Sequence, residues 1–81
     1  MNADRAREVL FDALGQVAPE IEPTGIDPKA ALRDAADLDS MDFLSLIGSL
    51  AEAIGGDIPE DDYPRLETVD DAVAYLASRL D

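Results

Sequence analysis

Residues 40–54 have the sequence SMDFLSLIGSLAEAI, which is the clearest indication of the fold class. Its large apolar side chains recur at the three- and four-residue spacing of one helix face, at Phe43, Leu46, Ile47, Leu50 and Ile54. Asp39 or Ser40 can cap the first turn, and Gly55 follows the last apolar residue, where a left-handed C-cap is favoured. We therefore predict a helix over residues 40–54 with one face in a core.

Two flanking segments have the same helical period. Residues 3–17 predict a helix that Asn2 or Asp4 can cap and that Pro19 prevents from continuing. Its apolar stripe consists of Ala6, Val9, Leu10, Ala13, Leu14 and Val17. Residues 69–80 predict a last helix, capped by Thr68, whose inward face consists of Val69, Ala72, Val73, Leu76 and Leu80.

The connection between the first two helices, residues 18–38, is long and rich in Pro and Gly. Within it, Asp27-Pro28 predicts a single helical turn near residues 28–32. We expect Ile21, Ile26 and Leu32 to hold the connection against the core. Residues 59–65 predict a short turn or helix that ends near Pro64.

No segment has the alternating pattern of a strand, so the predicted fold class is all-α. We expect a small bundle of three to four helices with a long loop between helices one and two. A chain of 81 residues has the length of one small domain, so residues 1–81 are expected to form a single domain.

Composition excludes several classes of function. The formal net charge of −13 disfavours binding to nucleic acid or to an anionic membrane, and favours partners with basic patches. The absence of His and Cys removes the usual acid–base residue, the thiolate nucleophile and thiolate metal sites. No apolar run is long enough to span a bilayer, and the first ten residues do not resemble a signal peptide. We expect a cytoplasmic monomer that is not an enzyme and holds no metal.

The second predicted helix leaves two large apolar side chains, Met41 and Leu44, at or near the surface beside Ser40. One interpretation is structural: Ser40 is an ordinary N-cap, and Met41 and Leu44 fill local gaps. The other is that Ser40 is a functional site at a helix N-terminus.

Residues 37–44, DLDSMDFL, favour the functional interpretation because they resemble the Asp-Ser-Leu/Met signature of acyl carrier proteins. The resemblance extends over nearly the whole chain. A long loop follows helix one, Ser40 opens helix two, and Thr68-Val69 opens the last helix. An Ile58-Pro59 pair followed by acidic residues precedes the short helix.

The resemblance implies that Ser40 carries 4′-phosphopantetheine, which a phosphopantetheinyl transferase takes from coenzyme A. The thiol of this arm would then carry acyl or aminoacyl groups as thioesters, in fatty-acid-like, polyketide-like or specialised secondary metabolism. The implied partners are an acyl or aminoacyl ligase and acyl-transferring enzymes with basic patches. The residues expected to contact them are Asp39, Met41, Asp42, Leu44, Glu52, Glu60, Asp61 and Asp62.

Two departures from the usual pattern favour a specialised stand-alone carrier. Met41 replaces the more usual Leu, and no acidic residue occurs between Asp42 and Glu52. A carrier of the aminoacyl or D-alanyl type is one alternative, and a non-carrier helical protein-interaction module is another. A calcium-binding domain is suggested by Asp57, Glu60, Asp61 and Asp62, but these residues lack the EF-hand spacing.

Overall fold

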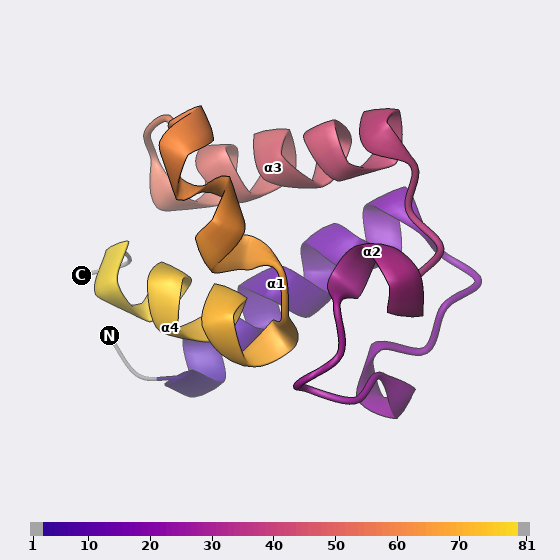
Figure 1. The fold of residues 1–81 in the computed structure, drawn as a ribbon. Helices are drawn as coiled ribbons and strands as arrows, with labels where there is room; N and C mark the ends of the chain where they lie inside the picture. The colour runs from indigo at the N-terminus through magenta and orange to yellow at the C-terminus, as the bar shows by residue number, and fades with distance from the viewer. Residues whose placement is uncertain (1–2, 80–81) are drawn as a thin grey trace.

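Three long helices form the framework of the computed structural model, which describes residues 3–79 (Figure 1). They are α1 (Ala3–Val17), α3 (Ser40–Ile54) and α4 (Val69–Arg79). Shorter helical segments occupy the connections: η1 (Pro23–Gly25), α2 (Leu32–Ala35) and η2 (Glu60–Leu66). The predicted all-α class is therefore correct, and the bounds of α1 and α3 are those predicted.

The core lies where α1 packs against both α3 and α4. The predicted stripes are buried: Leu10 and Leu14 on α1, Leu46 and Leu50 on α3, and Leu76 on α4 are each at most 1 % exposed. Val17 and Ile54, at the ends of their helices, are only partly buried against this core. The predicted inward residue Leu80 and the predicted cap Asn2 lie outside the described residues. Asp4, the other predicted cap, lies inside the first turn of α1.

The connection of residues 18–38 is packed on the core, as predicted. Ile26 and Leu32 are buried and Ile21 is partly buried. The predicted helical turn at residues 28–32 is wrong in position. Asp27 closes a non-helical turn there, its carbonyl accepting from Ala30 N at 3.0 Å and its side chain from Lys29 N at 2.9 Å. Helical geometry begins only at Leu32.

A backbone bridge explains why the helix begins there. Leu32 N donates to Glu67 O at 2.6 Å, and Asp70 N donates to Pro28 O at 3.1 Å. The first bond belongs to an isolated antiparallel bridge between Ala31 and Thr68, and the second joins the same two segments beside it. The bridge holds Ala31 in an extended conformation, so α2 cannot begin before Leu32.

Caps fix the ends of the two later helices. The Asp39 side chain accepts a hydrogen bond of 2.8 Å from Asp42 N at the start of α3, and Gly55, with φ of 73°, ends it. Thr68 Oγ1 accepts from Asp71 N at 3.0 Å and caps α4, as predicted. Between α2 and α3, Asp37 is left-handed, with φ of 53°.

A buried tyrosine attaches η2 to α4. Tyr75 OH donates to Asp62 Oδ2 at 2.7 Å and accepts from Arg79 Nη1 at 2.6 Å. The guanidinium of Arg65 lies 4.8 Å from the centre of the Tyr75 ring. Arg79 also reaches Asp57 O at 3.1 Å, so one network holds the segment that returns from α3. No helix within residues 3–79 has the length and apolar character needed to cross a membrane.

Candidate functional site

Ser40 is the first residue of α3, and its side chain is exposed. The N-cap is Asp39, whose carboxylate accepts a hydrogen bond from the backbone N–H of Asp42. The interpretation of Ser40 as an ordinary N-cap is therefore wrong, because the preceding residue performs that role. The Ser40 hydroxyl lies at a bend in the chain without a capping function, where another protein can reach it.

The hydroxyl of Ser40 has a cationic neighbour. Arg33 Nη2 donates to Ser40 Oγ at 3.4 Å from α2, seven residues earlier in the chain. The same guanidinium lies 5.2 Å from the centre of the Phe43 ring, one turn along α3 from Ser40. Arg33 is thus held over the beginning of α3 by a hydrogen bond and a cation–π contact.

A groove of about 670 Å³ extends from Ser40 between α2, α3 and η2. Its apolar lining comes from Leu38 before α3, Phe43 and Leu44 on α3, and Tyr63 and Pro64 on η2. Since these residues come from three segments, the groove exists only in the folded chain.

One ring pair and three charges determine the character of this groove. Phe43 and Tyr63 meet edge to face, with ring centroids 5.9 Å apart, and join α3 to η2. Arg33, Asp34 and Glu67 also line it. The groove therefore offers an apolar surface with charged groups beside Ser40.

Met41 and Leu44 are exposed large hydrophobic residues, at 77 % and 55 %. They are on α3 with Ser40, and the exposure expected from the helical spacing is confirmed. Asp39 is exposed and Asp42 is half-buried on the same turn. The structure thus brings together four of the eight predicted partner-contact residues around Ser40.

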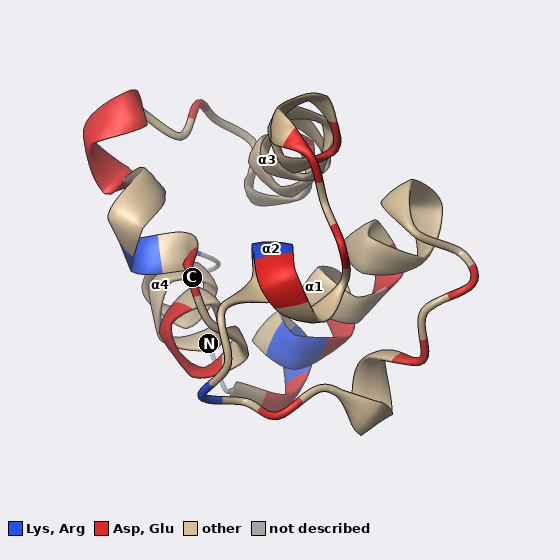
Figure 2. Ribbon diagram, turned by 45° about the vertical axis from the view of Figure 1, so that its right-hand side comes forward, with Lys and Arg blue, Asp and Glu red and all other residues tan. Residues whose placement is uncertain are grey.

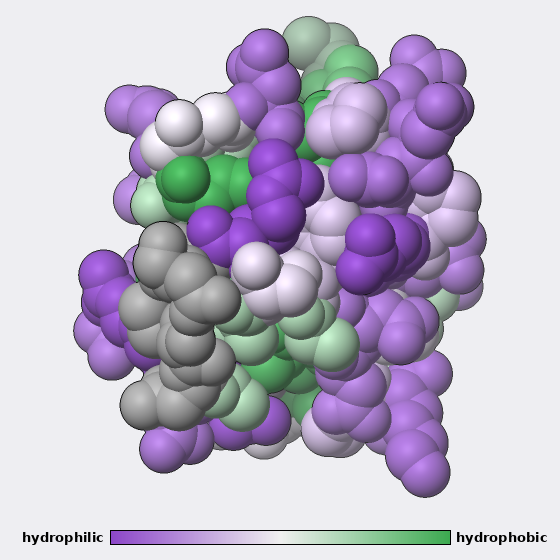
Figure 3. Space-filling view, turned by 90° about the vertical axis from the view of Figure 1, so that its left-hand side faces the viewer, coloured by the Kyte–Doolittle hydropathy of each residue, from purple (hydrophilic) through white to green (hydrophobic). Residues whose placement is uncertain are grey.

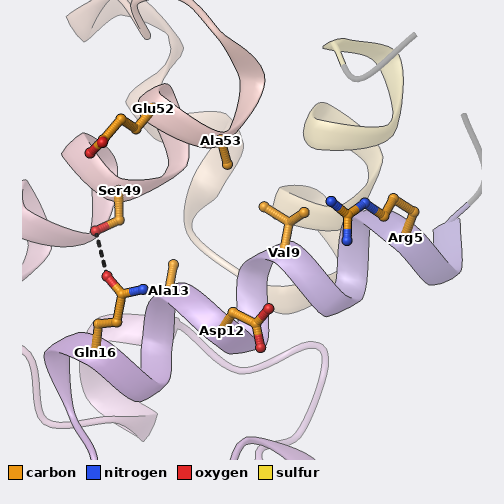
Figure 4. A pocket seen from close by; sticks show the side chains of 8 residues that line it. All are labelled: Arg5, Val9, Asp12, Ala13, Gln16, Ser49, Glu52 and Ala53. Atoms are coloured by element: carbon orange, nitrogen blue, oxygen red, sulfur yellow. Dashed lines mark hydrogen bonds between the residues drawn. The ribbon is translucent and has the colours of Figure 1, made fainter.

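Glu52 lies apart from these four. It is more than three turns after Ser40 on α3, about 18 Å along the helix axis. There it lines a separate hollow of about 380 Å³ between α1 and α3, with Arg5 and Asp12 (Figure 4). Ser49 Oγ donates to Gln16 Oε1 at 3.4 Å across this hollow. Its lining is mainly polar, unlike the groove at Ser40.

The first turn of η2 contains three consecutive acidic residues, Glu60, Asp61 and Asp62. They form the red turn at the upper left of Figure 2. Glu60 and Asp61 are exposed. Asp62 is half-buried, and its carboxylate is bonded to Tyr75 and lies 3.8 Å from Arg79 Nη1. Asp62 therefore has a structural role in the fold, while Glu60 and Asp61 remain accessible.

The end of the molecule remote from Ser40 is different in character. Seen from the left of Figure 1, its surface is mostly hydrophilic, with small, separate hydrophobic areas (Figure 3). Within residues 3–79 no group of three or more His, Cys, Asp or Glu residues has the arrangement needed to hold a metal ion.

Arg33 and Tyr63 are the site residues that sequence reasoning missed. Arg33 lies in a connection without helical periodicity, and its approach to Ser40 depends on the turn at Asp37. Tyr63 lies in a short segment whose direction is set by its attachment to α4. The available signal was weak: Arg33 is the only basic residue between Lys29 and Arg65.

Comparisons with known proteins agree with this geometry. A family model described as "Phosphopantetheine attachment site" matches residues 7–76, which include Ser40 and the whole groove. An acyl carrier protein of Rubrobacter xylanophilus is 32 % identical over 72 residues, or 89 % of this chain and 83 % of that protein. An acyl carrier protein of Zymomonas mobilis is 31 % identical over 74 residues, or 91 % of this chain and 88 % of that protein.

Proposed function

The chain belongs to the acyl carrier proteins, which carry covalent 4′-phosphopantetheine and are not enzymes, and we propose that Ser40 is its attachment residue. The observation that carries this proposal is the position of the Ser40 hydroxyl: exposed, at the first turn of α3, and released from capping by Asp39. An exposed hydroxyl at a bend can enter the active site of a modifying enzyme. We propose that the whole chain acts as one carrier domain.

The surroundings of Ser40 fit the arm. Its phosphodiester is anionic, and Arg33 is the cation beside the hydroxyl. Its pantetheine part and an attached acyl group are partly apolar, and the groove that begins at Ser40 has an apolar lining from Leu38, Phe43 and Leu44. Within the described residues, the site therefore offers complementary chemistry to both parts of the arm.

The attachment step requires an enzyme partner. Ser40 Oγ attacks the phosphorus of coenzyme A that bears the pantetheine. A new phosphodiester bond forms, the bond to the nucleotide part breaks, and adenosine 3′,5′-bisphosphate leaves. The proton of the hydroxyl needs a base, and its observed neighbour, Arg33, is a cation that cannot serve as one. We propose that the transferase supplies the base and the magnesium ion.

When attached, the arm supplies a thiol that holds an acyl group as a thioester. The role of this chain is then delivery, and its surface determines which enzymes receive the cargo. The negative charge would accelerate encounter with basic enzyme surfaces. We propose that the contact surface consists of Asp39, Met41, Asp42 and Leu44, with Glu60 and Asp61 at its edge.

The middle of α3 supports a specialised carrier. Between Asp42 and Glu52 the exposed positions Ser45 and Gly48 have no charge, so a partner that requires a continuous acidic helix finds a gap. Glu52 faces the hollow next to α1 and does not extend the surface around Ser40. We therefore propose acyl transfer in a specialised pathway, with an aminoacyl group as the second candidate cargo because Met41 follows Ser40.

The test is modification by coenzyme A, magnesium and a broad-specificity phosphopantetheinyl transferase, followed by intact-mass measurement. Wild type should gain the mass of one arm. Ser45→Ala is the matched control, since Ser45 is another exposed serine on α3, and it should be modified at the wild-type rate. Ser40→Ala should remain unmodified.

A second readout uses the absence of cysteine. The chain contains no Cys, so a maleimide dye can label it only through the thiol of the arm. Labelling should appear after the transferase reaction in wild type and Ser45→Ala, and not in Ser40→Ala. An unchanged wild-type mass with a competent transferase, or a modified Ser40→Ala, would show that the assignment is wrong.

A further inference from the structure

Arg33 occupies a position that the attachment of an arm would use. Its Nη2 reaches Ser40 Oγ at 3.4 Å, and its guanidinium lies 5.2 Å from the centre of the Phe43 ring. Both contacts place its positive charge at the mouth of the groove, which Arg33 also lines. The Ser40 hydroxyl alone stabilises a cation at this position only weakly, because a neutral acceptor forms a weaker hydrogen bond with a cation than an anionic acceptor does.

Arg33 forms no ion pair with the other residues that the structure describes. The ion pairs formed within residues 3–79 join Arg5 to Glu8, Arg7 to Asp4 and Arg79 to Asp62, and Arg33 is in none of them. This is notable because acidic residues surround it in sequence, among them Asp34 and Asp37. Arg33 is directed instead at the one hydroxyl proposed to become a phosphodiester.

We propose that Arg33 binds the phosphodiester of the arm and orients its first link along the groove. This inference rests on the proposed attachment at Ser40. The two non-bridging oxygens of a phosphodiester are bonded to the phosphorus next to Oγ, two bonds from Oγ, so a guanidinium that already reaches Oγ lies close enough to reach them. The planar N–H fork of arginine suits two such oxygens, which lysine engages only as a point charge.

The contact with Arg33 would also offset the repulsion between the phosphodiester and the carboxylates near Ser40. Asp39 and Asp42 lie on the first turn of α3 and repel a new anion at Ser40. Arg33 approaches from α2, on the groove side, and supplies the opposite charge. Arg33 therefore draws the phosphodiester away from Asp39 and Asp42 and toward its own side of the groove, which Asp34 and Glu67 also line.

The experiment compares the carrier with and without its arm, in the absence of any partner enzyme. Apo and holo forms of wild type, Arg33→Gln, Arg33→Lys and Arg7→Gln are prepared, and intact mass confirms each holo form. Arg7→Gln is the charge-matched control, since it removes one positive charge from an exposed site on α1. The measured quantity is the melting temperature of the holo form minus that of the apo form.

We expect this difference to fall by about 2–5 °C in Arg33→Gln at low salt, and to remain at the wild-type value in Arg7→Gln. Arg33→Lys should keep part of the difference. Loss of the cation–π contact with Phe43 lowers both forms equally and cancels. At about 0.5 M salt the variants should converge, because screening weakens an exposed ionic contact.

The 31P chemical shift of the holo protein is an independent readout. It should change in Arg33→Gln and stay unchanged in Arg7→Gln. If Arg33→Gln alters neither the holo-minus-apo difference nor the 31P shift, the inference is wrong while attachment at Ser40 stands. If no holo form can be made from wild type, the proposed function itself fails, so the two failures are distinguishable.

Discussion

Leu44 and Leu50 lie on the same helix, α3, yet Leu44 is 55 % exposed and Leu50 is fully buried. Leu50→Ala should therefore lower the free energy of unfolding by about 2–5 kcal/mol, through lost burial and the cavity left behind. A domain of this size has only about 4–12 kcal/mol to lose. Urea unfolding of the apo protein, followed by far-UV circular dichroism, measures this change.

Leu44→Ala is the matched control, because it makes the same chemical change on the exposed face. It should alter the free energy of unfolding by no more than about 0.5 kcal/mol. Equal destabilisation by the two variants would show that the inward face of α3 is assigned wrongly.

The second prediction concerns alkaline pH. Burial, and next the hydrogen bond to Asp62, raise the pKa of the Tyr75 hydroxyl above its ordinary value of 10.0. Above pH 10 the unfolded chain loses this proton while the folded chain retains it, so stability falls as pH rises. Below pH 10 both states are protonated and Tyr75 adds no pH dependence. The expected loss is about 1.4 kcal/mol for each unit by which the pKa is raised.

Unfolding titrations between pH 8 and 11 test the contribution of this hydroxyl. Tyr75→Phe should be less stable at pH 8, since Asp62 and Arg79 lose a bonded neighbour, but should decline less steeply above pH 10. An unchanged slope in Tyr75→Phe would contradict the assignment.

A third prediction uses the two left-handed residues that flank the site helix. Asp37 has φ of 53° and Gly55 has φ of 73°. Asp37→Gly should raise the free energy of unfolding by about 0.5–1 kcal/mol, because glycine adopts this conformation without a steric cost. Gly55→Ala should lower it by about 1–2 kcal/mol for the same reason, although no atom lies within 4 Å of the added methyl group.

Thermal melts of the apo forms measure both changes, and Asp37→Asn separates charge from conformation. Asparagine keeps the tolerance for positive φ and removes the carboxylate. If Asp37→Asn stabilises as much as Asp37→Gly, the gain comes from charge and not from relief of the backbone.

Ionic strength should stabilise the protein. A net charge of −13 on 81 residues makes the folded state repel itself. Raising NaCl from about 10 to about 200 mM shortens the Debye length from about 30 to below 10 Å and should raise the melting temperature. A melting temperature that falls with salt would mean that attractive contacts such as Asp62–Arg79 outweigh the repulsion.

Partner recognition should divide between apolar contact and charge. With its cognate ligase, holo Leu44→Ala should load more slowly at both low and high salt, because an exposed apolar contact is not screened. Asp42→Asn should load more slowly at low salt and approach wild type at high salt, because charge mainly raises the association rate. Normal loading of Leu44→Ala, with a salt-independent loss in Asp42→Asn, would exclude the mixed surface.

The three long helices could be predicted because their apolar residues recur at helical period. The tertiary contacts in the structure bury the same residues that this pattern places on one face. The short helix α2 could not be placed, since it begins where the bridge to Glu67 ends, and that bond joins residues far apart in sequence. Tyr75 was missed as a core residue for a related reason: its hydroxyl can be buried only because Asp62 and Arg79 come to it.

Ser40, Met41 and Leu44 could be identified because one helix positions all three. Arg33 could not, because its approach to Ser40 depends on the conformation of Asp37. Charge alone would group Glu52 with the site, but its position on α3 separates the two. Local patterns therefore predict the long helices, whereas the contacts between elements depend on the folded structure.

The bridge between Ala31 and Thr68 divides the chain into two parts: a base that contains α1 and α4, and a cassette that consists of residues 31–68. The chain leaves the α1–α4 base at residue 31 and returns to it at residue 68, and the two crossing points are joined backbone to backbone. The cassette contains all the features that are proposed to matter for delivery, namely Ser40, Arg33 and the groove. An exchanged cassette can therefore change what the carrier recognises, provided that it keeps the α3 face buried against α1, with Leu46 and Leu50, and an acceptor at Asp62 for the Tyr75 hydroxyl.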